Sequence, residues 1–490
     1  MFASSLITGA YKHLSALWSA LVLLLVGGCS INPVTLDREL TLMSESEEIE
    51  LGRQYHQQFL EQHDVYNDPR VQKYVNGVGQ NIALLSHRNN LDYQITVIDS
   101  PELNAFALAG GYIYVTRGMM AYLNSEAELA AVLAHEVGHI AGRHAVRKDA
   151  VMKIPNFLGQ VLFNHIGFGI DRSYNKFLQA KLQHFSQEFE LEADRLAVEY
   201  LVRSGYSPTA MSRVISTIKG NEEQVKQLAA VSNPRASIYH GFNAHPDSSK
   251  RQQLVQQEIQ TLGTEIPEGR SPVRLGYLEH VHGLVYGASQ SGRVVKGKHL
   301  HAPSRSGLNV PAGWHVNSSG KILRMVSPGE EAVIQVLSKP HSPGTSAQTH
   351  LHRLLLSDEL FDEVALERDD LQGWIARSTK QTADGEIPLW LATWIIDDVV
   401  RVMVATATSD EYAQSIIDTL RSFSRLSEAE LQLTQPRRVD VLQAEAGMSY
   451  HQLGLDSPLK SNAEQQLRLI NGQTDINEDL RAGQWIKVIR

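Results

Sequence analysis

Cysteine is nearly absent from this chain, which contains only one, Cys29, in 490 residues. A single cysteine cannot form a disulfide within the chain, so a disulfide-based fold is excluded. A surplus of basic residues is also absent: 45 Lys and Arg stand against 54 Asp and Glu, which gives a formal net charge of −9. This negative balance argues against nucleic acid as a partner. At this length we expect two or three domains.

The single cysteine follows an apolar run, Leu14–Val26, and residues 1–28 contain one base and no acid. This pattern resembles a bacterial lipoprotein signal, in which residues 1–28 are removed and Cys29 is lipidated as the first residue of the mature chain. By analogy with known lipoproteins, Ser30 favours the outer membrane. An uncleaved membrane anchor is the alternative, but the run is short for a span of about 20 residues. We therefore expect a protein of the bacterial periplasm that is lipid-anchored to the outer membrane.

The most informative motif is His-Glu-Val-Gly-His, which begins at His135. His135 and His139 are spaced i, i+4, so on a helix they project from one face and can both reach a single metal ion. Glu136 lies about 100° around the helix axis and can reach a water at that ion without being a ligand. Ser125, with Glu128 three residues later, predicts a capping box that starts this helix. A pair of satisfied core histidines is the alternative.

A third ligand decides the class of such a site. His144 nearly fits the metzincin pattern, but that pattern requires histidine where Ala145 stands. His144 would face away from the other two histidines, so we expect it at the surface or behind the ligands. Glu190 and Asp194 are a better pair, because they share one face of a second predicted helix. A carboxylate ligand, backed by an acid that accepts an imidazole N–H, is what a two-His-one-Glu zinc site needs. The alternative is a solvated acidic face.

These motifs together resemble a known family. Residues 124–139, followed by Glu-x-x-Ala-Asp at 190–194, are similar to the BepA-type periplasmic zinc metallopeptidases, gluzincins related to the HtpX and CAAX-prenyl endopeptidases. The resemblance covers roughly residues 32–262. It implies one Zn²⁺ per chain and the following roles: His135, His139 and Glu190 as ligands, Asp194 behind a ligand histidine, and Glu136 as general base.

A third motif lies at residues 243–251 and begins Asn-Ala-His-Pro. In the family a histidine here can approach the zinc, so the resemblance implies that His245 holds the enzyme closed or assists the transition state. Alternatively, His245 merely precedes a helix that begins at Pro246. Arg251 could point back into the cleft and stabilise an oxyanion, although a solvent-exposed arginine is the equal alternative.

Substrate binding has its own candidate segment. After Gly111, the side chains of Tyr112 and Tyr114 alternate with Ile113, which predicts a β-strand. An edge strand beside the zinc helix could hold an extended peptide by β-addition, and the resemblance implies that use. On sequence alone the segment is equally an interior strand.

The predicted fold is multidomain α+β. Its parts are a signal peptide at 1–28, a mainly helical zincin-like peptidase domain with a short sheet at 29–263, a Gly/Pro-bearing linker at 264–272, a small α+β accessory domain of unknown role at 273–430, and a strand-helix-helix-strand module at 437–490. An apolar segment at 151–170 would be a lid, a membrane-contacting patch or part of the core.

The carboxyl-terminal module, residues 437–490, resembles a LysM module. LysM modules bind glycans that contain N-acetylglucosamine, so peptidoglycan is an implied partner. The segment that begins at Ala446 replaces the usual Gly-Asp-Thr-type turn, however, which leaves open a structural role or the binding of envelope assembly proteins.

Two functions remain. The first is a zinc endopeptidase that acts on periplasmic or misassembled outer-membrane proteins, in protein quality control. The second is a latent or non-catalytic, chaperone-like lipoprotein scaffold of the cell envelope, which holds zinc structurally or keeps His245 on the metal. The presence of all the expected ligands and of the base favours the enzyme.

Overall fold

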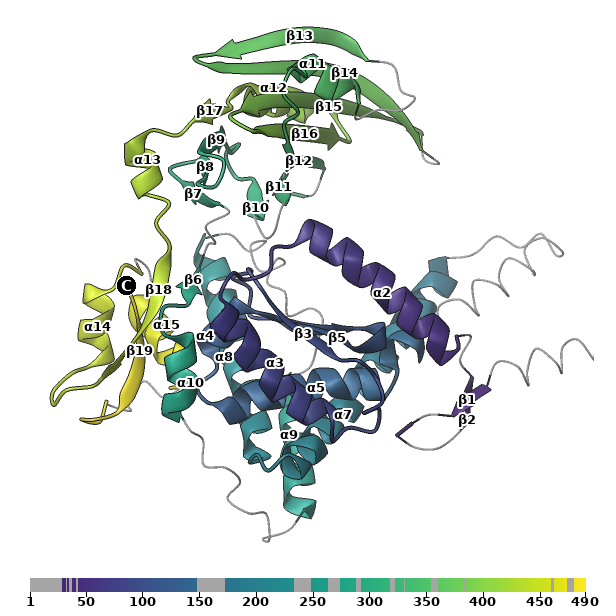
Figure 1. Ribbon diagram of the computed structural model, residues 1–490, viewed down its shortest axis with the longest axis vertical. Helices are drawn as coiled ribbons and strands as arrows, with labels where there is room; N and C mark the ends of the chain where they lie inside the picture. The colour runs from purple at the N-terminus through teal and green to yellow at the C-terminus, as the bar shows by residue number, and fades with distance from the viewer. Residues whose placement is uncertain are drawn as a thin grey trace, which may run out of the picture.

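The structure, a computed structural model, describes fourteen stretches of the chain. The predictions for residues 1–28, 151–170, His245 and 264–272 concern residues outside these stretches. The described residues are 29–31, 33–34, 38–40, 43–147, 172–232, 248–262, 274–287, 292–317, 322–329, 331–353, 360–382, 385–459, 462–473 and 480–490. They form a mixed α+β protein, as predicted (Figure 1). No helix within these stretches is long and apolar enough to cross a membrane.

The peptidase part is mainly helical, with a small sheet (Figure 1). Its elements are β1 (Cys29–Ile31), β2 (Arg38–Leu40), α2 (Glu45–Gln62), α3 (Pro69–Ala83), β3 (Gln94–Ile98), β4 (Ala105–Leu108), η1 (Ala109–Gly111), β5 (Tyr112–Thr116), α4 (Arg117–Tyr122), α5 (Glu126–Ala141), α7 (Arg172–Arg203), α8 (Thr209–Ser232) and α9 (Ser248–Thr261). Phe59 and Leu60 of α2 pack on the sheet, against Tyr112 and Tyr114.

The sheet has the order β3-β5-β4, with β5 parallel to β3 and antiparallel to β4. Of the two alternatives for the segment Gly111, Tyr112, Ile113 and Tyr114, the interior strand is therefore confirmed and the edge strand, which the resemblance implied, is wrong; Gly111 itself lies in η1. Both sides of β5 are already hydrogen-bonded, and all five of its residues are buried, so it has no free edge for a peptide. Within the described part of the chain, β4 is the edge strand that lies against α5.

The helix that carries the histidine motif, α5, is buried along almost its whole length. Its cap differs in part from the predicted capping box. The Ser125 hydroxyl accepts the N–H of Glu128, as expected, but the Glu128 carboxylate accepts the N–H of Asn124, one residue before the cap, at 2.7 Å. One free N–H group of the first turn, that of Glu128, thus finds a side-chain acceptor, and Glu128 also fixes the residue before the cap.

Glycine inside the motif lets two helices approach closely. A Cβ atom at Gly138 would lie 3.0 Å from the carbonyl oxygen of Ala193 in α7. This contact brings the face of α7 that carries Glu190 and Asp194 against the histidine face of α5, so the glycine helps to bring the two halves of the motif together.

The accessory part consists of two antiparallel sheets around a core of its own. A seven-stranded sheet has the order β10-β11-β12-β16-β15-β14-β13, and a four-stranded sheet has the order β17-β9-β8-β7. The elements are β7 (Arg293–Val295), β8 (Lys298–His301), β9 (Ser306–Asn309), β10 (His315–Asn317), β11 (Ile322–Val326), β12 (Ala332–Pro340), α11 (Ala347–His352), β13 (Phe361–Arg368), β14 (Leu371–Thr382), β15 (Gly385–Ile396), β16 (Val399–Ala407), η4 (Asp410–Tyr412), α12 (Ala413–Arg421), β17 (Ser424–Arg425) and α13 (Glu428–Gln432).

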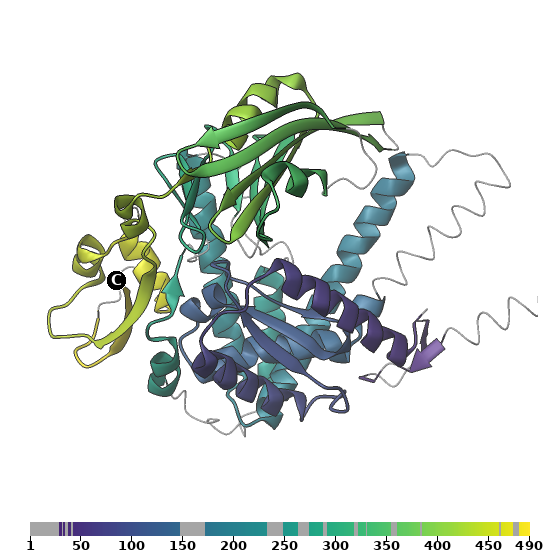
Figure 2. The ribbon, with the colours of Figure 1, turned by 45° about the horizontal axis from the view of Figure 1, so that its top comes forward.

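The carboxyl-terminal part has the predicted order strand-helix-helix-strand: β18 (Arg437–Gln443), α14 (Tyr450–Asp456), α15 (Ala463–Ile470) and β19 (Trp485–Ile489). It does not stand apart. Strand β18 also pairs with β6 (Val285–Tyr286), which follows α10 (Arg274–Val281). Buried residues of α10, β6 and this module belong to the same hydrophobic core as α3, α4 and α5, and both views show the module against the peptidase part (Figures 1 and 2). Residues 274–286 therefore pack with the peptidase part.

Candidate metal centre and active site

Three side chains from two helices converge at the middle of the peptidase part. Nε2 of His135 and Nε2 of His139 lie 3.0 Å apart. Each also lies 3.4 Å from a different carboxylate oxygen of Glu190, which α7 supplies. The three sequence-predicted ligands are thus brought together, in a setting where His135 and Glu190 are buried and His139 is nearly so.

This arrangement fits a zinc ion. Ligand atoms about 2.0–2.1 Å from a tetrahedral zinc lie about 3.3 Å from one another, and the three separations here are 3.0, 3.4 and 3.4 Å. Two imidazoles and a carboxylate are also a donor set that catalytic zinc uses. Within the described residues this is the one group of three such ligands.

Asp194 and Arg251 lie behind the ligands. Nδ1 of His135 is 2.8 Å from Oδ1 of Asp194. Arg251 in α9 donates two N–H groups to the Asp194 carboxylate, each at 2.7 Å, and its third nitrogen lies 3.3 Å from Glu190. The guanidinium is therefore directed to the carboxylates, and its oxyanion role stays a prediction. Both residues are almost fully buried.

The charges in this cluster stabilise one another. Burial raises the pKa of the Asp194 carboxyl, but the charge and hydrogen bonds of Arg251 outweigh it and hold that pKa below its usual value. Burial likewise lowers the pKa of His135, yet its hydrogen bonds to Asp194 and Glu190 outweigh burial and raise the pKa to about 9. The Asp194 carboxylate is therefore ionised, as the acceptor behind a ligand histidine must be.

His144 supports the second histidine. Its Nδ1 lies 2.8 Å from Nδ1 of His139, and its Nε2 lies 3.4 Å from Glu192. Sequence reasoning placed His144 facing away from the site, because helical spacing would turn it there. The helix ends before it, however: Arg143 adopts a left-handed conformation, with φ of 52°, and this turns the chain so that the buried His144 ring comes back beside His139.

A buried ion cluster that sequence reasoning did not identify ties α2 to the end of α5. Glu48 accepts N–H groups from Arg88 and Arg143, both at 2.8 Å, and Arg88 also donates to the carbonyl oxygen of Ile140. Positions so far apart in the chain gave no local signal that could have revealed this cluster.

Glu136 is buried and lies between two cavities. The larger, of about 210 Å³, is lined by β4 and η1 on one side and by Glu136, His139 and Glu190 on the other. The smaller, of about 30 Å³, is apolar apart from His135, Glu136 and Arg251. The carboxylate therefore borders the space beside the ligand cluster where a substrate would lie, and the edge strand β4 forms the opposite wall.

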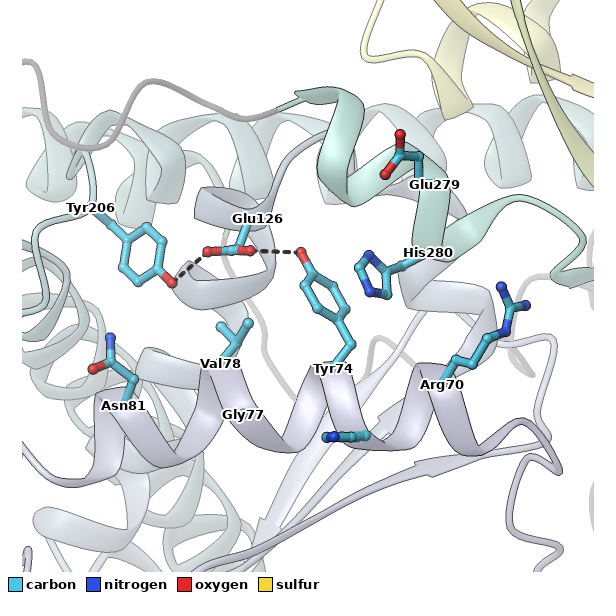
Figure 3. A pocket seen from close by; sticks show the side chains of 10 residues that line it. Arg70, Tyr74, Gly77, Val78, Asn81, Glu126, Tyr206, Glu279 and His280 are labelled. Atoms are coloured by element: carbon cyan, nitrogen blue, oxygen red, sulfur yellow. Dashed lines mark hydrogen bonds between the residues drawn. The ribbon is translucent and has the colours of Figure 1, made fainter.

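A larger cavity lies elsewhere in the described residues. It measures about 690 Å³ and is at the amino-terminal end of α5, between α3 and α10 (Figure 3). There Tyr74 and Tyr206 donate hydrogen bonds to the two carboxylate oxygens of Glu126, at 3.0 and 2.8 Å, and His280 stacks on Tyr74. No predicted metal ligand lines it, so size alone does not mark the active site.

The other predicted site residues lie as follows. Cys29 is in the short strand β1, opposite Leu40 of β2, and nothing more is described of its side chain. His245 is outside the described residues.

The family model of Peptidase family M48 matches residues 69–259, the stretch that contains the three ligand residues and Glu136. Residues 69–259 are thus similar to the M48 peptidases, which are zinc metallopeptidases, and the His-His-Glu cluster in this stretch fits a zinc site.

Curated relatives agree with this assignment. The chain is 30% identical over 181 residues to the beta-barrel assembly-enhancing protease of Escherichia coli K12, which covers 34% of this chain and 37% of that protein. It is 28% identical over 220 residues to the mitochondrial metalloendopeptidase OMA1 of Arabidopsis thaliana, or 44% of this chain and 42% of the relative. The chain therefore spans less than half the length of these relatives.

Among solved structures, cyanobacterial PsbP from Synechocystis sp. PCC 6803 is similar over 28% of this chain and 98% of its own, at 12% identity and a TM-score of 0.23. A similarity this low carries no functional argument.

Proposed function

We propose that this protein is a zinc-dependent endopeptidase of the bacterial cell envelope. The observation that carries the proposal is the convergence of His135, His139 and Glu190, with ligand atoms 3.0–3.4 Å apart, beside the buried carboxylate of Glu136. A scaffold that needed zinc only for stability would have no use for a base next to an open cleft.

Each side chain has a separate task in this proposal. Zinc at the three ligands would polarise a peptide carbonyl and make a water molecule more acidic. Glu136 takes a proton from the attacking water and passes it to the leaving amine. Asp194 accepts the Nδ1–H of His135, which directs Nε2 of that ring to the centre. Arg251 holds the Asp194 carboxylate in place through its two hydrogen bonds.

Strand β4 takes over the substrate role that sequence analysis gave to β5. It is the edge strand of the sheet within the described residues, and Phe106, Ala107 and Leu108 line the cavity next to Glu136 and His139. An extended peptide that pairs with this edge would lie along the cleft, with main-chain hydrogen bonds that do not depend on its sequence. This supports unfolded protein segments as substrates.

The cellular setting belongs to the same proposal. The Escherichia coli relative is named for beta-barrel assembly, which supports misassembled outer-membrane proteins as substrates here. Cys29 would anchor the chain to the outer membrane through lipid, the LysM-like module would meet peptidoglycan or envelope assembly proteins, and His245 would close the site until substrate arrives.

The decisive variant is Glu136→Gln, which keeps the size of the side chain and removes the base. We expect it to retain one zinc per chain, measured by atomic emission, and to lose about 10²–10⁴-fold in the rate of hydrolysis of an unfolded protein substrate. Glu188→Gln, at an exposed position of α7, is the matched control and should behave as wild type. Full activity of Glu136→Gln would remove the base from the proposal, whereas zinc-free wild-type protein would remove the metal centre.

A further inference from the structure

A polar cluster lies between the two sheets of the accessory part, far along the chain from the metal centre. In β16, Arg401 shares a face with Met403 and Ala405, which belong to the core between the sheets, and it lies opposite Ser338 of β12. In β8, His299 pairs with Leu308, which belongs to the same core. The side chains of Arg401 and His299 therefore enter the space between the sheets from opposite sides.

Arg401 is a buried cation with one partner. It is only 4% exposed, and its guanidinium donates a single hydrogen bond, from Nη1 to the hydroxyl of Ser338. Its Nε has no acceptor, and no carboxylate of a described residue forms an ion pair with it. Burial lowers the pKa of this guanidinium to about 10, which still leaves it charged at neutral pH.

The opposite wall offers further polar groups but no negative charge. Nε2 of His299 is buried without a hydrogen-bond partner, and the residue is 1% exposed. Next to it, Nδ1 of His301 lies 2.5 Å from the Ser304 hydroxyl, which in turn lies 2.7 Å from that of Ser306. Burial and the charge of Arg401 lower the pKa of both histidines to about 3, so both rings are neutral.

A buried cation without an anion is a costly feature in a folded protein, since the lost hydration is not replaced. The cost is recovered when a bound anion supplies the missing acceptors. A guanidinium fork, an imidazole N–H and serine hydroxyls are the groups that bind the oxygens of carboxylates and phosphates. Ser338 is exposed while Arg401 is not, so the cluster reaches the surface on the β12 side.

We propose that Arg401, with Ser338, forms a binding site for an oxyanion between the two sheets of the accessory part. The ligand is a molecule that carries a carboxylate or a phosphate ester, and its oxygens accept from Nε of Arg401 and from the hydroxyl of Ser338. This gives the accessory part a ligand-binding role that is independent of the peptidase activity.

Thermal denaturation of the full-length protein tests the site. Phosphate and acetate, each compared with chloride at equal ionic strength, supply the two oxyanion chemistries. At an oxyanion concentration well above the dissociation constant, the wild type should gain about 2–4 °C in Tm over chloride. The anion that gives the larger rise identifies the phosphate ester or the carboxylate as the ligand group.

Two variants make the result specific. Arg401→Met removes the cation but keeps an apolar side chain of similar length, so it should lose the oxyanion-dependent rise and, in chloride, be at least as stable as the wild type. Arg324→Met, at an exposed position of β11 in the same sheet, should keep the full rise. An equal rise in Arg401→Met, or no rise in the wild type with either oxyanion, would overturn the proposal.

Discussion

Asp194 is the residue that connects the metal centre to a third helix. Its carboxylate contacts the ligand His135 on one side and accepts both N–H groups of Arg251 from α9 on the other. The ring orientation of the ligand thus depends on a chain of two charged, buried groups. Removal of one member leaves the other buried without its partner, which is costly in a low-dielectric interior.

We therefore expect Asp194→Asn to weaken zinc affinity about 10–100-fold, because an amide is a poorer acceptor for His135 and cannot balance Arg251. A competition titration with a chromophoric chelator measures this. Glu199→Gln, which alters a more exposed ion pair with Arg203 on the same helix, should leave the affinity unchanged. Equal zinc affinities in the two variants would contradict the proposal that Asp194 orients the ligand His135.

At the scale of elements, the site depends on how closely α5 and α7 pack. The two helices are close at Gly138, since a Cβ atom there would lie 3.0 Å from the carbonyl oxygen of Ala193 in α7. This oxygen belongs to the helix backbone, so it cannot shift without moving α7. Gly77 in α3 is the opposite case, with no atom within 4 Å of the same added carbon. Both glycines have helical backbone conformation, but only Gly77 has room for an added Cβ atom.

This difference predicts opposite signs for one substitution. Gly77→Ala should stabilise the protein by about 0.5–1 kcal/mol through helix propensity. Gly138→Ala should destabilise it by about 1–3 kcal/mol, because overpacking outweighs propensity, and should weaken zinc binding as α7 moves away. Urea unfolding of the two variants beside the wild type measures both. Stabilisation by Gly138→Ala would mean that α5 and α7 can accommodate a methyl group at this position, and would contradict the prediction.

The helical i, i+4 spacing explains which parts of the metal centre could be predicted from the sequence. The i, i+4 pairs His135/His139 and Glu190/Asp194 share a face because helix geometry requires it, and the family resemblance joined the two pairs into one site. His144 was misplaced because its position depends on one left-handed residue, Arg143. The interior position of β5 depends on pairing with strands elsewhere in the chain, which alternation along one strand cannot reveal.

At the scale of the whole molecule, the carboxyl-terminal part completes the peptidase part. The last carbonyl groups of a helix need hydrogen-bond donors from outside it, and for α4 these donors come from distant residues. Tyr277 donates to the carbonyl oxygen of Met120 at 2.7 Å. Fully buried Lys487 donates to those of Ala121 and Leu123, at 2.7 and 2.6 Å. Strand β19 thus fixes the turn that leads into the zinc helix.

Lys487→Met should therefore lower both stability and activity. Two buried carbonyl groups lose their donor, at about 1–3 kcal/mol each, and the turn before α5 is released. We expect a fall in Tm together with a lower kcat, measured by calorimetry and by substrate turnover. Arg490→Met removes an exposed charge next to the same strand and should change neither. A separable module would leave the peptidase unaffected in both variants.

The hydrogen bonds from Lys487 to the carbonyl groups of Ala121 and Leu123 form late in the synthesis of the chain. Lys487 follows Ala121 by 366 positions, and at about 5–20 residues per second a ribosome needs roughly 20–70 s to cover such a distance. During that interval the histidine motif has been synthesised, but the turn before α5 lacks the hydrogen bonds from Lys487. Under the proposed function, a nascent chain therefore reaches its full rate of hydrolysis only after Lys487 has been made and has reached these carbonyl groups.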